Sequence, residues 1–143
     1  MEKIDIGLTL VTVQVGDNPD NIVRFDPADY GLISRVKQIT KSFEGLDEKD
    51  FVGDTEGKEE LDIAAEAIDK MREKVYGEID KLFYEPVCNK LFGDRFSTKE
   101  VESFLTKIIK VMGKYIEKEQ KESQKRLEKY LPPQKQKTRV KKK

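Results

Sequence analysis

The chain has 143 residues, of which 39% are charged and 36% are hydrophobic, and its formal net charge is zero. This length fits one domain with a modest core. The sequence contains no histidine, the commonest general base and metal ligand near neutral pH, so its composition predicts a binding protein rather than an enzyme, with no metal and no cofactor.

An N-terminal β-hairpin is predicted within residues 3–25. Residues 3–15 alternate apolar and polar side chains with the two-residue period of a half-buried strand. The alternation changes phase at Leu10, which predicts a bulge there or a segment covered on both faces. Residues 16–21 are rich in turn formers, and residues 22–25 resume strand character. Because an isolated hairpin is marginally stable, we expect it to pack on helices; the alternative is that its edge pairs with another molecule.

A first helix is predicted to start at Asp26 and Pro27, since aspartate is a favoured N-cap and proline is tolerated at the first helical position. Apolar residues then recur at helical spacing as far as Phe43, and Gly45 marks the end. Residues 44–62 carry nine acidic and two basic side chains, which predicts a solvated loop. A charged docking patch is the alternative reading of that loop.

The second predicted helix spans residues 59–83 and has an apolar stripe on one face. Gly77 lies inside it, where a close helix crossing or a slight bend is expected. Pro86 ends this region, and residues 87–92 are predicted to form a short helix that closes at Gly93. The expected stripe consists of Leu61, Ala64, Ala65, Ile68, Met71, Val75, Ile79 and Leu82.

Apolar side chains cluster on both sides of Pro86, and two interpretations of them remain open. They are either ordinary core or a partly open aromatic patch that binds another protein. Within this cluster Cys88 is the only cysteine of the chain, so we expect a buried structural thiol and no disulfide. The candidate protein-binding residues are Phe83, Tyr84, Val87, Leu91 and Phe92.

The last predicted helix begins with a capping box in which Ser97 caps the Glu100 N–H and Glu100 reaches back to Ser97. Its apolar face ends at Ile116, and residues 117–126 are polar on every side. That stretch should project into solvent, be held by pairs of opposite charges, or await a partner. The expected apolar face consists of Val101, Phe104, Leu105, Ile108, Val111, Met112, Tyr115 and Ile116.

The C-terminal end is basic. Residues 114–143 hold twelve Lys/Arg and four Asp/Glu, whereas the rest of the chain is acidic, so body and tail could attract each other within a chain or between copies. We expect Leu131-Pro132-Pro133 to end the helix and the following residues to be disordered. Nucleic-acid binding is the alternative use of this end, although the acidic body and the lack of aromatic residues after Tyr130 weigh against it. The candidate electrostatic residues are Lys135, Lys137, Arg139, Lys141, Lys142 and Lys143.

These elements predict an α+β fold that is mainly α, with the hairpin packed on about four helices and a disordered basic C-terminal tail. We divide it into a hairpin segment (1–26), a helical body (27–131) and a Lys-rich tail (132–143). No apolar run approaches the ~18 residues needed to span a bilayer, and the N-terminus is unlike a signal peptide. We therefore expect a cytoplasmic protein without a membrane partner.

The order of these features resembles the small tail assembly chaperones of long-tailed bacteriophages and prophages of Gram-positive bacteria. The resemblance covers most of residues 22–131 and is carried chiefly by Arg24-Phe25-Asp26-Pro27 and by Val87-Cys88-Asn89-Lys90-Leu91-Phe92-Gly93. It implies a non-catalytic protein of the bacterial host cytoplasm that is absent from the mature virion. Such a protein binds the tape measure protein, keeps it soluble, and recruits major tail tube subunits.

Many such phages use a ribosomal frameshift that appends a second domain to some copies. The terminal Lys141, Lys142 and Lys143 would fit an A-rich slippery stretch, and a plain solubilising tail would explain them equally. Self-association of the chaperone is also possible. A structural virion component is a third functional class, alongside the chaperone and the nucleic-acid-binding protein.

Overall fold

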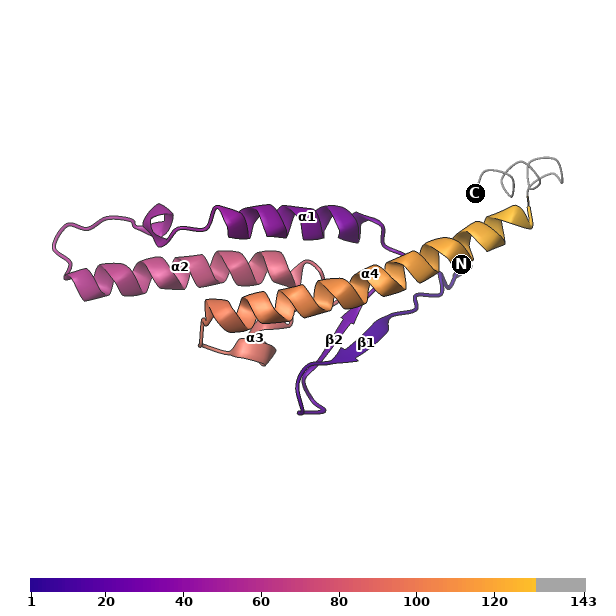
Figure 1. The fold of residues 1–143 in the computed structure, drawn as a ribbon, viewed down its shortest axis with the longest axis horizontal. Coiled ribbons are helices and arrows are strands. Elements are labelled where there is room, and N and C mark those ends of the chain that lie inside the picture. Colours follow the sequence, from indigo (N-terminus) through magenta and orange to yellow (C-terminus); the bar gives the residue numbers. More distant parts are fainter. Residues whose placement is uncertain (131–143) are drawn as a thin grey trace.

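The computed structural model describes residues 1–130, and it confirms a mainly helical fold with an N-terminal two-stranded hairpin (Figure 1). The last helix ends at Glu128, with Lys129 as its C-cap, shortly before the predicted stop at Leu131-Pro132-Pro133. The predicted basic tail (132–143) lies outside the described residues. Helices α1, α2 and α4 run along the length of the molecule, and the hairpin lies on one side of α4 (Figure 1). In chain order the elements are β1 (Val11–Gln14), β2 (Ile22–Phe25), α1 (Gly31–Glu44), the 3-10 helix η1 (Glu48–Phe51), α2 (Glu60–Asp80), α3 (Cys88–Phe92) and α4 (Thr98–Glu128).

The hairpin is shorter than the alternation of residues 3–15 predicts, and it contains no bulge at Leu10. Strands β1 and β2 pair antiparallel, and the pair of Val11 with Phe25 is the last one. Residues 1–10 are not in a strand, because β2 ends at Phe25, opposite Val11, and no further strand lies beside them to pair with. The change of phase at Leu10 therefore marks the start of β1. The inner face of β2 is apolar and buried, with Val23 and Phe25 in the core.

Helix α1 begins at Gly31, four residues later than the Asp26 and Pro27 signal predicts. The Asp26 carboxylate accepts the Ala28 N–H (2.9 Å), and the Asp29 carboxylate accepts the Gly31 N–H (3.0 Å). Both aspartates thus stabilise turns in the connection, and neither is the N-cap of the helix. The predicted end is confirmed, since Gly45 is the C-cap.

Only the second half of the apolar stripe predicted for α2 is buried. Leu61 is 79% exposed and Ile68 38% exposed, and the two alanines between them are also exposed. The first turns of α2 extend past the beginning of α4, so α4 does not cover that part of the stripe, and only η1 and its neighbours lie beside α2 there (Figure 1). Gly77 faces open space, so the predicted close helix crossing there is wrong. The buried residues of α2 are Ala67, Met71, Val75, Tyr76 and Ile79.

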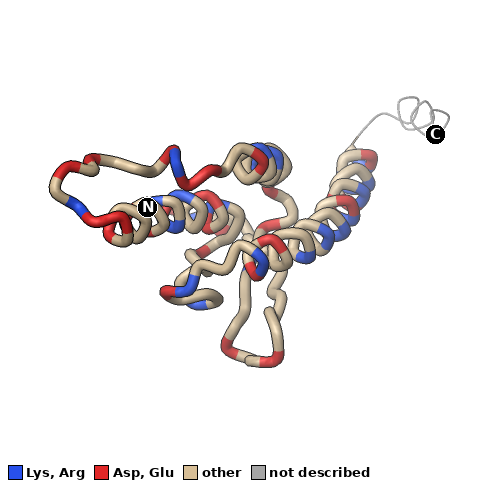
Figure 2. Tube along the Cα trace, turned by 60° about the vertical axis from the view of Figure 1, so that its left-hand side comes forward, with Lys and Arg blue, Asp and Glu red and all other residues tan. Residues whose placement is uncertain are grey.

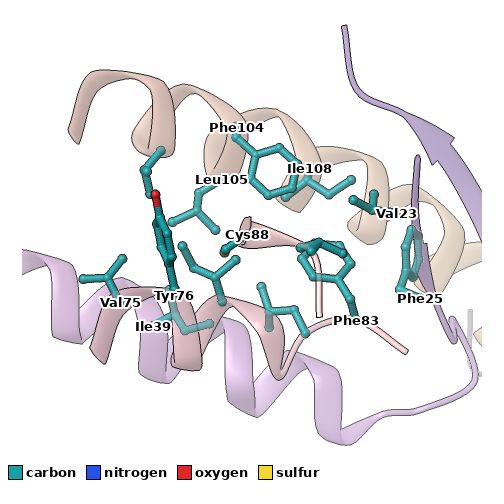
Figure 3. Close-up of a cluster of buried hydrophobic side chains, with 14 of the residues drawn as sticks. Val23, Phe25, Ile39, Val75, Tyr76, Phe83, Cys88, Phe104, Leu105 and Ile108 are labelled. Atoms are coloured by element: carbon teal, nitrogen blue, oxygen red, sulfur yellow. The ribbon is translucent and has the colours of Figure 1, made fainter. Parts of the chain in front are cut away.

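The core lies where the hairpin, α1, α3 and the second half of α2 meet α4 (Figure 3). Tyr76 of α2 stacks on Phe92 and meets Phe96 edge-on, with ring centroids 6.0 and 5.9 Å apart. Its hydroxyl donates to the backbone carbonyl of Arg95, which satisfies the only polar group of this buried ring. Tyr76 therefore ties the connection between α3 and α4 to α2.

Helix α4 confirms the predicted start and the predicted projection. The Ser97 hydroxyl accepts the Glu100 N–H (3.3 Å), whereas the Glu100 carboxylate lies 3.7 Å from Arg95 instead of returning to Ser97. The helix continues for 31 residues, and Ile116 is its last buried side chain. The remaining turns extend away from the body (Figure 1). Exposed ion pairs accompany this segment, at 3.3 Å for Glu117–Lys121 and 2.7 Å for Glu119–Arg126.

Charge is unevenly distributed over this fold. Acidic side chains gather in the long connection between α1 and α2, and basic side chains recur along the second half of α4 (Figure 2). Among residues 1–130, no helix is both long and apolar enough to cross a membrane.

Candidate functional site

An apolar groove lies between β1, α3 and the first half of α4. Its volume is about 800 Å³. The apolar lining comes from three separate elements that meet only in the folded chain. These lining residues are Val13 and Val15 from the hairpin, Leu91 and Phe92 from α3, and Phe104, Ile108 and Val111 from α4.

Local sequence patterns create this lining. In β1 the valines at every second position face α4, whereas Thr12 and Gln14 between them face outward and are exposed. On α4 the residues Phe104, Ile108 and Val111 follow at spacings of four and three, which places them on one face. That face is wider than the hairpin, so part of it stays open at the groove.

The rim of the groove is basic. Arg95, Lys99 and Lys107 line it, and Glu100 is its one acidic member. Arg95 and Glu100 lie 3.7 Å apart and are both well exposed, so this ion pair is weak. Within residues 1–130, Lys99 and Lys107 form no ion pair, and the groove therefore presents an apolar floor beside positive charge.

A half-buried capping interaction fixes α3, which forms one wall of the groove. The Asp80 carboxylate at the end of α2 accepts the backbone N–H groups of Val87 (2.9 Å) and Cys88 (3.0 Å). The side chains of both of these residues are fully buried. At the other end of α3, Gly93 has a φ of 60° and a ψ of −135°, a conformation that only glycine adopts without strain. The wall is therefore held at both ends.

Cys88 is buried directly behind this wall, as the sequence predicts. Burial raises the pKa of the Cys88 thiol strongly, and the neighbouring Asp80 carboxylate raises it further. The thiol is therefore protonated at neutral pH and is neither a nucleophile nor a metal ligand in this environment. Its contribution to the site is packing.

The structure separates the five predicted protein-binding residues. Phe83 and Val87 are buried in the core, and Phe92 is 8% exposed with one edge at the groove. Leu91 is half-buried and lines the groove. Tyr84 is 64% exposed, but it lies on another side of the hairpin, where its N–H donates to the carbonyl of Arg24. Leu91 and Phe92 are thus the members that reach the groove.

The sequence-based prediction missed most of the groove. The hairpin valines were assigned only to a strand, and the basic rim was not recognised at all. A usable signal was present, because Lys99, Ser103 and Lys107 repeat every four residues along the edge of the α4 apolar face. The groove itself depends on how far the hairpin covers that face, which no local pattern specifies.

The described residues contain no group of three or more His, Cys, Asp or Glu side chains that could hold a metal ion. The predicted electrostatic residues, Lys135 to Lys143, lie outside them. Comparisons with protein-family models, with curated proteins and with solved structures found no match for this chain.

Proposed function

We propose that this protein is a non-catalytic binding protein that acts as a tail assembly chaperone. Its client would be the tape measure protein, around which it would recruit major tail tube subunits in the cytoplasm of the bacterial host. The resemblance carried by residues 24–27 and 87–93 supports this family. The observation that carries the binding function is the open apolar groove with a basic rim.

The chemistry of the groove suits an amphipathic helix. An apolar stripe at positions i, i+3 and i+4 of a client would contact the floor, and acidic residues beside the stripe would face Lys99 and Lys107. Each large apolar side chain that the groove buries contributes about 1.5–3 kcal/mol before the costs of association. A few such contacts give reversible binding, which is what a chaperone needs to keep a long helical client in solution.

The first test is co-expression of this chain with the tape measure and tail tube proteins of the same phage, followed by pull-down and measurement of soluble tape measure protein. Two variants address the groove: Val111→Asp places a charge on its floor, and Lys107→Glu reverses its rim. Lys110→Glu is the matched control, because Lys110 is an exposed lysine of α4 that does not line the groove.

We expect soluble tape measure protein with the unchanged chain and with Lys110→Glu, and at least about a tenfold weaker retention with the two groove variants. Aggregation of the tape measure protein with the unchanged chain would refute the chaperone function. Retention unaffected by both groove variants would refute the groove as its site. Detection of this chain in purified particles would favour the structural virion component instead.

A further inference from the structure

One edge of the hairpin has peptide groups without partners. The N–H of Val15 donates to the carbonyl of Asn21 (2.7 Å), so in this antiparallel register the odd-numbered residues of β1 direct their peptide groups at β2. Thr12 and Gln14 consequently direct theirs to the outer edge of β1. Among the described residues, these outward peptide groups form no hydrogen bond.

The other edge of the hairpin is already covered. By the same alternation, Ile22 and Arg24 of β2 direct their peptide groups outward. There the Arg24 carbonyl accepts the Tyr84 N–H (2.8 Å), and the Ile22 carbonyl accepts from Lys90 Nζ (2.6 Å). A further strand can therefore add to the sheet only at β1.

The groove lies on this open side of the sheet. Val13 and Gln14 of β1 and the adjacent Val15 form its hairpin wall, and α4 lies across from them. A strand added to the outer edge of β1 would lie over the exposed part of the α4 face. Every second side chain of that strand would point into the groove, as the side chains of Val13 and Val15 do.

The N-terminal arm, residues 1–6, has the pattern that such a strand needs. Ile4 and Ile6 share one parity and are 88% and 90% exposed, so their side chains have almost no apolar contacts. Lys3, before the two isoleucines, and Asp5, between them, would face solvent in an extended strand. Apart from Met1 the rest of the arm is polar, and two exposed isoleucines of the same parity are typical of an edge strand that awaits a partner.

We propose that the arm of one copy adds as an antiparallel third strand to the free edge of β1 in a second copy, and that its isoleucines fill the groove. This exchange would be reciprocal and would form a two-fold dimer. The pairing needs no client. Its further role, covering the client groove until a client displaces the arm, rests on the proposed function.

The antiparallel direction follows from side-chain parity and charge. Pairing Asp5 with Thr12 sets Ile4 beside Val13 and Glu2 beside Val15. Phe25, which pairs with Val11, lies 6.2 Å from the Tyr115 ring, so the Val11 end of β1 faces the middle of α4 and the Val15 end faces its beginning. The Glu2 carboxylate then approaches the part of the rim formed by Arg95 and Lys99.

A second copy is a better donor than the same chain. Leu8 lines a second pocket together with Leu32 of α1 and Tyr84, and this pocket shares no lining residue with the groove. Gly7, with a φ of 64°, and the bond from its N–H to the Asp5 carboxylate (2.9 Å) form a turn just before Leu8. The arm therefore leaves its own hairpin away from the groove, and an extended arm of six residues reaches about 20 Å.

The first test measures the mass of the purified full chain by sedimentation equilibrium over a range of concentrations, without any client. We expect a dimer whose dissociation constant rises at least about tenfold in the double variant Ile4→Asp/Ile6→Asp. Thr12→Pro should have a similar effect, because it removes an N–H from the free edge and no bond from the β1–β2 ladder. Leu61→Asp, at an equally exposed leucine far from the groove, is the matched control and should remain dimeric.

The second test is a directed cross-link between two singly substituted chains, Ile4→Cys and Val13→Cys, mixed and oxidised. Facing residues in a non-hydrogen-bonded antiparallel pair suit a disulfide, and the buried Cys88 stays out of the exchange. A disulfide-linked heterodimer supports the proposal. A monomer at every concentration, or a dimer that keeps its affinity in the arm and Thr12→Pro variants, overturns it. A third chain carries both substitutions, and a disulfide that forms only within this chain, with no linked heterodimer in the mixture, also overturns the proposal.

None of these outcomes depends on the tape measure protein. Conversely, an arm variant that no longer dimerises but still retains the client would show that client binding does not require the arm exchange. The arm exchange and the chaperone function can therefore fail independently.

Discussion

Replacement of Asp80 tests whether a single carboxylate holds the wall of the groove. Asp80 accepts two backbone N–H groups, from Val87 and Cys88, across a gap of seven and eight residues. Asp80→Ala removes the acceptor and leaves both donors inside the protein, whereas Asp80→Asn keeps an oxygen in the same place. The two variants therefore separate the hydrogen bonds from the charge.

The expected loss follows from burial. Val87 and Cys88 are both 0% exposed, so water does not readily replace the lost acceptor. An unsatisfied buried donor costs about 1–3 kcal/mol, and Asp80 itself is half-buried, so we place Asp80→Ala at about 2–4 kcal/mol in total. Asp80→Asn should cost about 1 kcal/mol or less, because a neutral oxygen accepts the same bonds more weakly. Against a total stability of about 5–15 kcal/mol, the alanine variant is a large perturbation.

Urea unfolding followed by circular dichroism measures these differences. Asp94→Ala is the control, because this aspartate is exposed in the loop after α3 and its removal should change the free energy of unfolding by less than about 0.5 kcal/mol. An Asp80→Ala variant within about 0.5 kcal/mol of the unchanged protein would refute the reasoning. It would show that solvent or another group satisfies the two N–H groups when the carboxylate is absent.

Three further predictions concern pH, backbone conformation and the projecting helix. Because burial raises the pKa of the Cys88 thiol, the folded state keeps a proton that the unfolded chain loses above about pH 8.5. The free energy of unfolding should be unaffected by this group below that pH and should fall above it by up to about 1.4 kcal/mol per pH unit, and Cys88→Ala should remove this part of the slope in urea titrations. Gly93→Ala should destabilise by about 1–3 kcal/mol because of its positive φ, whereas Gly113→Ala, in open space on a helix, should stabilise by about 0.5–1 kcal/mol; equal effects in thermal melts would contradict the conformational argument. Residues 117–126 should exchange amide hydrogens quickly in the free protein and slowly with a bound client, and equal exchange in both states would exclude this segment from the interface.

The sequence predicted elements best where a local signal and the core agree. The Ser97 cap, the short helix before Gly93 and the polar extension after Ile116 were all predicted from neighbouring residues alone. The errors occurred where a local signal had no tertiary support. Leu61 continues a helical apolar stripe that no other element covers, and residues 3–10 alternate like a strand without a strand beside them.

The candidate site shows the same division. The sequence identified Leu91 and Phe92 as binding candidates because they are apolar residues beside a break, and it could not separate them from buried Phe83 and Val87. That separation depends on which side of α3 meets α2 and α4.

By itself, then, the sequence determined the helical character of the chain, the starts of α2, α3 and α4 to within one residue, the buried state of Cys88 and the absence of histidine chemistry. Each of these depends on residue type or on contacts between neighbours along the chain. The sequence did not determine the end of α2, which lies at Asp80 rather than at the predicted Phe83. The tertiary structure alone decided that the hairpin covers only part of α4, that Asp80 caps a helix seven residues later, and that one edge of β1 stays open. The physical reason is that a groove or a free strand edge forms where tertiary packing ends, and the contacts that set this limit join residues distant in sequence.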